Sequence, residues 1–129
     1  MLNNNPEVLK IDMPVLEKRK QKEIGIISDS QFNEIYPPSI QLLAQRHWTP
    51  LDVAIKAADF LAAENNVSIL DIGSGVGKFC LAAANHKPKA FFTGVEQRLS
   101  LIRHAETAKT LLQLNNAWFI NGNFTQIDF

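Results

Sequence analysis

Three alternating glycines follow a short apolar segment in the middle of the chain, and this pattern constrains the fold more than any other feature. The segment has the sequence SILDIGSGVGKFCLAAA (residues 68–84), with glycines at Gly73, Gly75 and Gly77. The apolar run before the glycines is typical of a β-strand, and the alanine-rich run after them is typical of an α-helix. Glycine permits backbone conformations that other residues avoid. The sequence therefore predicts a strand, a bare turn and a helix in direct succession.

The alternation of strand and helix continues toward the end of the chain. We expect strands at 67–72, 90–96 and 117–123, with helices at 78–86 and 99–114 between them. Strands that alternate with helices are typical of crossover units and hence of a parallel sheet. The sequence predicts an α/β fold in which N-terminal helices precede a partial Rossmann-like sheet of three parallel strands.

The part of the chain before this sheet is predicted to be helical. Helical spacing over 6–25 and over 28–48 is interrupted by prolines. Thr49 and Pro50 then open a further helix, for which threonine is a favourable N-cap and proline suits the first turn. These patterns predict several short helices before residue 49 and a longer one after it.

Composition excludes several classes of protein. The formal net charge of the 129 residues is zero, so the chain as a whole has no electrostatic attraction to nucleic acid or to an anionic membrane. The single cysteine, Cys80, excludes an internal disulfide and suits the cytoplasm, where we expect the protein to be. The sequence contains no run of roughly 20 apolar residues that could span a membrane. We predict no metal site, because the histidines lack the spacing of metal ligands: His47, His86 and His104.

Two familiar glycine motifs fit the turn poorly. A phosphate-binding loop has the pattern G-x-x-x-x-G-K-[ST]. Gly77 and Lys78 match its end, but Ile72 occupies the first glycine position and Phe79 follows the lysine. A dinucleotide-binding turn has the pattern G-x-G-x-x-G, and here Lys78 stands where the third glycine packs the helix against the strand.

A third pattern, D-x-G-x-G-x-G, is met in full by Asp71 and the three glycines. The sequence in this respect resembles S-adenosylmethionine-dependent methyltransferases of the seven-strand class. The phrases DIGSGVGK and GVEQ are also similar to the seven-strand histone-lysine methyltransferase family and its bacterial relatives. The resemblance implies that the cofactor lies against the loop formed by Gly73, Ser74, Gly75 and Gly77. It also implies that the next helix binds the methionine carboxylate through its N-terminal N–H groups, with Asp71 near the positive amino and sulfonium groups.

Four further residues are candidates for cofactor binding. Glu96 ends the second strand, about 20 residues after the loop, where an acid can accept bonds from both ribose hydroxyls. The resemblance implies that Asn123 accepts a bond from the adenine amino group. Phe124 lies either against the adenine ring or in the core. Thr49 either contacts the methionine carboxylate or serves as a plain N-cap.

The resemblance covers roughly residues 48–129. We predict that residues 49–129 form a partial S-adenosylmethionine-binding domain behind an N-terminal helical segment, 1–48. It implies that the complete protein transfers a methyl group to a protein or a nucleic acid. The alternative is a non-catalytic module that binds the cofactor or a partner. Because the fourth strand of the class is missing before Phe129, we expect a truncated chain that is inactive alone.

The predicted topology leaves part of the sheet uncovered. Successive right-handed crossovers in one direction place both helices on the same face. The apolar strand at 67–72, whose composition is that of a buried strand, then lies at an edge. We expect that the N-terminal helices cover this surface, that a second copy of the chain covers it in a homodimer, or that the chain is a fragment of a longer protein.

Overall fold

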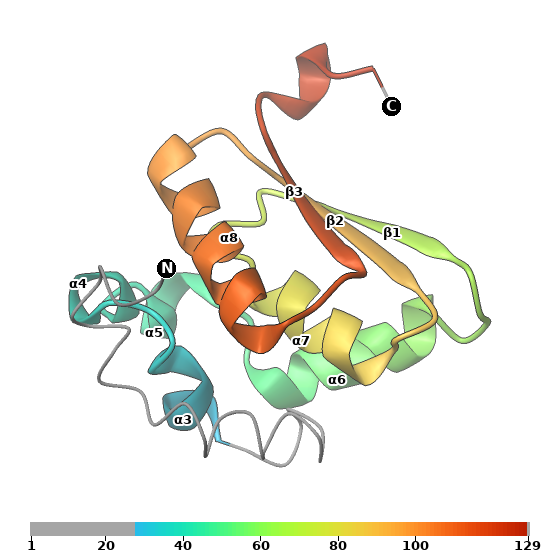
Figure 1. Ribbon diagram of the computed structural model, residues 1–129, viewed down its shortest axis with the longest axis horizontal. Helices are drawn as coiled ribbons and strands as arrows, with labels where there is room; N and C mark the ends of the chain where they lie inside the picture. Colours follow the sequence, from blue (N-terminus) through green and yellow to red (C-terminus); the bar gives the residue numbers. More distant parts are fainter. Residues whose placement is uncertain (1–27, 129) are drawn as a thin grey trace.

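The computed structural model describes residues 28–128, which form a three-stranded sheet with its helices packed on one side (Figure 1). The predicted helical spacing over 6–25 lies outside the described residues. The longest described helix has 14 residues, and no helix in this range is long and apolar enough to cross a membrane. The elements are α3 (Asp29–Asn33), α4 (Pro38–Gln41), α5 (Ala44–His47), α6 (Leu51–Leu61), β1 (Ser68–Ile72), α7 (Lys78–His86), β2 (Phe91–Glu96), α8 (Leu99–Leu112), β3 (Ala117–Asn121) and the 3₁₀ helix η3 (Phe124–Gln126).

The sheet confirms the predicted fold class. Its strands are parallel and lie in the order β1-β2-β3, with α7 and α8 as the crossover helices. Asp71 lies opposite Gly94 on β2, and Glu96 lies opposite Asn121 on β3. Because the strands are parallel, their carboxyl ends meet at one edge of the sheet, and this edge gathers the glycine loop and Glu96.

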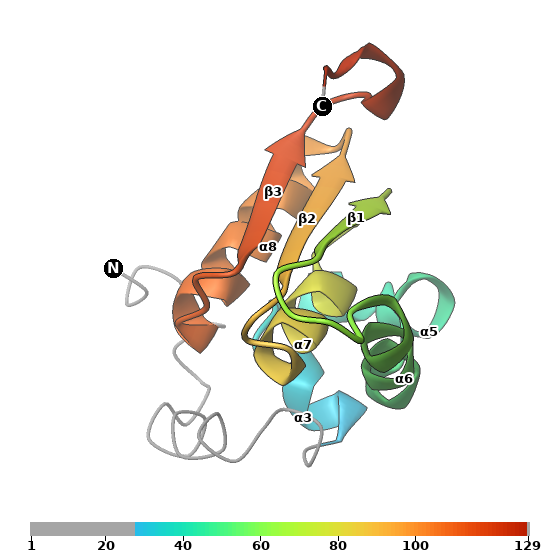
Figure 2. The same ribbon diagram turned by 90° about the vertical axis from the view of Figure 1, so that its right-hand side faces the viewer.

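Helices of the described residues cover one face of the sheet and leave the other face open. Figure 2 shows α7 and α8 behind the sheet, while the opposite face carries no helix of the described part. The edge position predicted for the first strand is confirmed, and exposed and half-buried residues alternate along β1, although its composition is that of a buried strand. The expected pairing of two copies through the bare face stays a prediction. Four large apolar residues on this face are more than a third exposed: Leu70, Ile72, Phe91 and Trp118.

The helices before the sheet are short, as the prolines predicted. Pro37 and Pro38 separate α3 from α4, and Pro38 begins α4. Phe32 and Tyr36 are fully buried and belong to the same hydrophobic core as the residues of α6, α7 and β2. The domain boundary predicted at residue 48 stays a prediction, but the described residues before it contribute to this common core.

The start of α6 differs from the sequence prediction. Thr49 does not cap the helix: the N-cap position is Pro50, and no side chain at that position bonds to the first turn. The N–H of Leu51 instead donates to Oδ1 of Asp29, at 2.9 Å. A carboxylate from α3 thus satisfies a donor at the start of α6, and sequence spacing alone contains no sign of this contact.

Candidate functional site

The glycines of the loop have two different structural roles. All three have positive φ, between 57° and 83°, which favours glycine over residues with a side chain. A Cβ at Gly73 or Gly75 would meet nothing within 4 Å, so these two positions face open space. A Cβ at Gly77 would lie 2.6 Å from the ring of Phe119. Gly77 therefore permits the close packing of the loop against β3, while Gly73 and Gly75 leave room for a ligand.

Two cavities meet at Gly73. The first, of about 210 Å³, lies between the glycine loop and the segment that joins α5 to α6. The second, of about 400 Å³, lies beyond the carboxyl ends of the strands. Arg98, which the sequence analysis did not single out, lines both of them. Of the predicted site residues, the first cavity is lined by Thr49, Asp71, Gly73, Ser74 and Gly75, and the second by Gly73, Glu96 and Phe124.

Neither Gly77 nor Asn123 lines either cavity in the described part of the chain. The side-chain oxygen of Asn123 instead accepts bonds from the N–H and the hydroxyl of Thr125, at 3.0 and 2.7 Å, and so caps η3. Ser74 lines the first cavity, but its hydroxyl is buried without a hydrogen-bond partner and lies over Gly94. The predicted adenine contact of Asn123 stays a prediction, and it requires an oxygen that the cap already uses.

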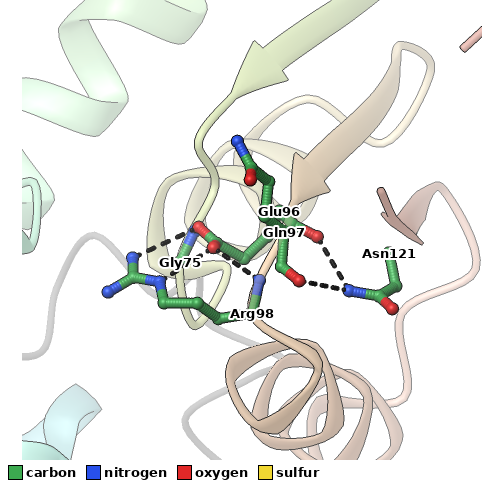
Figure 3. A network of polar contacts seen from close by, with 5 residues as sticks. All are labelled: Gly75, Glu96, Gln97, Arg98 and Asn121. Atoms are coloured by element: carbon green, nitrogen blue, oxygen red, sulfur yellow. Dashed lines mark hydrogen bonds and ion pairs between the residues drawn. The ribbon is translucent and has the colours of Figure 1, made fainter. Parts of the chain in front are cut away.

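Glu96 is buried at the end of β2 and accepts four hydrogen bonds (Figure 3). Its Oε1 accepts from the N–H of Gly75, at 3.0 Å, and from Nη2 of Arg98, at 3.4 Å. Its Oε2 accepts from the N–H and from Nε of Arg98, both at 2.9 Å. The side-chain bond with Arg98 is the main reason that the pKa of Glu96 is lowered. Glu96 therefore connects the glycine loop to the start of α8 as an ionised carboxylate.

Asn121 fixes the backbone at the same place. Its amide nitrogen donates to the carbonyl oxygens of Glu96, at 3.0 Å, and Gln97, at 2.9 Å (Figure 3). These bonds hold the turn between β2 and α8 against the end of β3. Asn121 was not among the predicted site residues, because it meets Glu96 only through the pairing of β3 with β2.

A second ion pair lies beside the first cavity. The ammonium of Lys78, the first residue of α7, contacts Oδ1 of Asp29 on α3. The same ammonium lies 5.7 Å from the ring centre of Phe32 and 6.0 Å from that of Trp48, within the range of cation–π attraction. Burial alone would raise the pKa of Asp29, but its bonds with Lys78 and with the N–H of Leu51 lower that pKa overall.

The buried hydroxyl of Tyr36 fastens the loop from the same side. It donates to the carbonyl oxygen of Val76 at 2.9 Å, and the two residues are 40 positions apart in the chain. The ring of Tyr36 also packs against Trp48, with 4.8 Å between ring centres. The segment from α3 to α4 therefore holds the glycine loop through the hydrogen bond of Tyr36 and the start of α7 through the ion pair of Asp29.

Asp71 lies at the end of β1 and lines the first cavity, as expected. Burial raises its pKa, and the thiol of Cys80 donates a weak bond to its Oδ2 at 3.9 Å. Cys80 is fully buried, and burial followed by the nearby Asp71 charge raises the pKa of its thiol well above the ordinary value. A positive group in the first cavity would stabilise the charge on Asp71.

Comparison with known proteins identifies the family. A family model described as a methyltransferase domain matches residues 63–129, which is more than half of the chain. The chain belongs to this family. Its partial sheet is that of the class I, S-adenosylmethionine-dependent methyltransferases, in agreement with the resemblance of the glycine loop. The more specific likeness to histone-lysine methyltransferases stays a prediction.

Individual relatives share only part of their length with the chain. A tRNA (guanine-N(7)-)-methyltransferase of Synechococcus sp. (strain JA-3-3Ab) is 43% identical over 54 residues, which is 42% of this chain and 23% of the relative. The N-terminal domain of EvdMO1, solved in the presence of SAH and D-fucose, has a TM-score of 0.58 at 21% identity, over 91% of this chain and 47% of that one. A type I restriction-modification methyltransferase subunit from Streptococcus thermophilus has a TM-score of 0.52 at 21% identity, over 63% of this chain and 19% of that one. These two structures show a common fold.

Proposed function

We propose that the glycine loop and its two cavities bind S-adenosylmethionine, and that this domain provides the cofactor site of a methyltransferase. The observation that carries the proposal is the open space over Gly73 and Gly75, at the point where the two cavities meet. Both glycines have a left-handed backbone and no neighbour within reach of a Cβ. The loop therefore leaves room for a ligand to lie directly on the backbone.

The residues around the loop fit the chemistry of this cofactor. The first cavity adjoins the start of α7, whose first N–H groups have no partner within the helix and suit the methionine carboxylate. Asp71, in the same cavity, suits the positive amino and sulfonium groups. Glu96, in the second cavity, suits the ribose hydroxyls. S-adenosylmethionine supplies an electrophilic methyl group on its sulfonium sulfur. The main task of the protein is therefore to position the methyl acceptor against this group.

Titration calorimetry tests the binding proposal. We expect S-adenosylmethionine and S-adenosylhomocysteine to bind more tightly than NAD or ATP. Gly75→Val should abolish the binding, because the branched side chain fills the space over the loop. Gly75→Ala, with the same backbone strain and less bulk, separates the steric effect from the strain, and circular dichroism checks that both variants fold. Equal or tighter binding of NAD would contradict the proposal.

The methyl acceptor is proposed to be a protein or a nucleic acid, and tRNA is the first substrate to test. The support for tRNA is the name of the Synechococcus relative, of which the chain spans 23%. An assay with cofactor labelled on the methyl group, the whole protein, and either bulk tRNA or bulk protein distinguishes the two acceptors. Cofactor binding without transfer to either would favour the alternative, a non-catalytic module that binds the cofactor or a partner.

We also propose a cytoplasmic location. Cys80 is the single cysteine of the chain and is a free thiol, which suits a reducing compartment. Fractionation of the source cells, followed by detection with an antibody to the chain, tests this proposal. Recovery in an exported fraction would contradict it.

A further inference from the structure

The carboxylate of Glu96 has no free position for a further donor. A carboxylate offers about four lone-pair sites. Two of them accept backbone N–H groups, from Gly75 and Arg98, and two accept Nε and Nη2 of the Arg98 side chain (Figure 3). A ribose that binds Glu96 through both hydroxyls needs two of these sites. The arginine side chain and the ribose therefore compete for the same oxygens.

The donors differ in how easily they can leave. The N–H of Gly75 belongs to the glycine loop, and the N–H of Arg98 belongs to the turn that Asn121 fixes from the next strand. The side chain of Arg98 is 68% exposed, whereas that of Glu96 is 5% exposed. A long, exposed side chain that leaves the carboxylate is solvated at once, so breaking this pair costs little.

We propose that the Arg98 side chain is a displaceable counter-ion of Glu96, which gives up two carboxylate positions to the vicinal hydroxyls of a ribose. This inference rests on the proposed function and adds a residue that determines specificity to the same site. The exchange is balanced in number, because two N–H donors leave and two O–H donors arrive. The two backbone N–H groups remain, and they keep the carboxylate oriented throughout.

The position of Arg98 means that the exchange affects ligands in both cavities. The residue lines both cavities. Without ligand, it pairs the buried charge of Glu96. With a ribose bound, it moves toward solvent, and part of the binding free energy is used to break the ion pair. Arg98 therefore weakens the binding of every ligand that carries a vicinal diol and has little effect on ligands without one.

The experiment compares the wild-type chain with Arg98→Met by titration calorimetry. The probes are S-adenosylhomocysteine, adenosine, and 2′,3′-dideoxyadenosine, which lacks both hydroxyls. Arg103→Met is the matched control, since Arg103 is an exposed arginine of α8 that lines neither cavity among the described residues. Arg98→Lys keeps the charge but not the two parallel donors, and it should fall between the wild type and Arg98→Met.

We expect Arg98→Met to bind S-adenosylhomocysteine and adenosine about fivefold more tightly, the gain expected when an ion pair with one exposed partner no longer has to be broken. Binding of 2′,3′-dideoxyadenosine should be nearly unchanged. Weaker binding of S-adenosylhomocysteine by Arg98→Met, with Arg103→Met unaffected, would overturn the inference, because Arg98 would then be a ligand of the cofactor. An equal gain for the dideoxy compound would also overturn it. Failure of S-adenosylhomocysteine to bind any of these proteins would overturn the proposed function and this inference together.

Discussion

Two ion pairs lie beside the two cavities, and they differ in which partner is buried, the cation or the anion. In the pair beside the first cavity, the cation is buried, with Lys78 4% exposed and Asp29 47% exposed. In the pair beside the second cavity, the anion is buried, with Glu96 5% exposed and Arg98 68% exposed. Each pair therefore consists of one charge that the fold encloses and one that remains near solvent.

The difference lies in what else stabilises the buried charge. Glu96 keeps two backbone N–H donors when the arginine side chain leaves. Among the described residues, Asp29 is the one acceptor within hydrogen-bond distance of the Lys78 ammonium, which otherwise faces the rings of Phe32 and Trp48. Losing the partner of a buried charge is costly when no other group stabilises that charge. We therefore expect the first pair to act as a permanent clamp and the second to exchange its arginine for a ligand.

Removal of Asp29 has the largest expected effect on stability. Asp29→Ala leaves the Lys78 ammonium without its carboxylate and the N–H of Leu51 without its acceptor. We expect the free energy of unfolding to fall by about 2–3 kcal/mol, less than for a fully enclosed pair because Asp29 is half exposed. Urea denaturation followed by circular dichroism measures this loss.

Asp52→Ala is the matched control for that experiment. Asp52 is an exposed acid in the first turn of α6, and its carboxylate bonds to the next N–H. Its removal should cost less than about 1 kcal/mol, as is usual for surface positions. Lys78→Met should also cost less than Asp29→Ala, because water can solvate the remaining half-exposed carboxylate. Equal losses for Asp29→Ala and Asp52→Ala would show that the first pair is no clamp.

The second largest expected effect is on ligand binding, and it follows from removal of Glu96, the buried acid of the second pair. Glu96→Ala removes a charged acceptor worth about 1.5–3 kcal/mol, so we expect the affinity for S-adenosylhomocysteine to fall by about one to two orders of magnitude. Titration calorimetry measures the change. Glu96→Gln, which keeps one oxygen acceptor without the charge, should fall between. Unchanged affinity in Glu96→Ala would remove the ribose role of this residue.

Removal of the exposed cation of the second pair should hardly affect stability. We expect Arg98→Met to change the free energy of unfolding by less than about 1 kcal/mol, because the exposed arginine is solvated and Glu96 retains its backbone donors. The same urea denaturation measures it. A loss of unfolding free energy as large as that of Asp29→Ala would show that both pairs stabilise the fold equally. The second pair would then not be an exchangeable one.

The smallest expected effect is the pH dependence of the second pair. The side-chain bond with Arg98 lowers the pKa of Glu96 below its ordinary value of 4.5. A lowered pKa in the folded state means that the pair stabilises the fold above pH 4.5 and loses this effect as the pH falls through the folded-state pKa. Carbon-13 NMR of the Glu96 carboxyl should detect the lowered pKa in the wild type and a higher one in Arg98→Met. Identical titration curves would show that Arg98 does not stabilise the charge.

Sequence patterns predicted the elements of the site better than its contacts. The helix at 78–86 agrees with α7 at both ends, and Asp71, Gly73 and Glu96 line the cavities where the loop pattern indicated a ligand. The N-cap role of Thr49 was wrong because a carboxylate from another helix satisfies the N–H of Leu51. Residues that act through partners distant in sequence were not singled out.

Arg98 and Asn121 illustrate two degrees of predictability. Arg98 follows Glu96 by two positions, so an acid at the end of a strand with an arginine two residues later was a local signal for an ion pair. Asn121 is 25 positions from Glu96 and meets it only because β3 pairs with β2 in the observed register. A contact of this kind depends on strand pairing, which spacing along the chain does not indicate.

The sequence by itself determined the order of strands and helices, the bare glycine turn and the chemical type of the site. These are local properties, because periodicity, proline and glycine act on the backbone within a few residues. Only the tertiary structure decided which charged side chains are buried and which partners stabilise them. Asp29 is 49 positions from Lys78, and Tyr36 is 40 positions from Val76. Such partners meet only when α3 packs against the glycine loop, since burial of a charge is a property of the surrounding packing and not of the neighbouring residues in the chain.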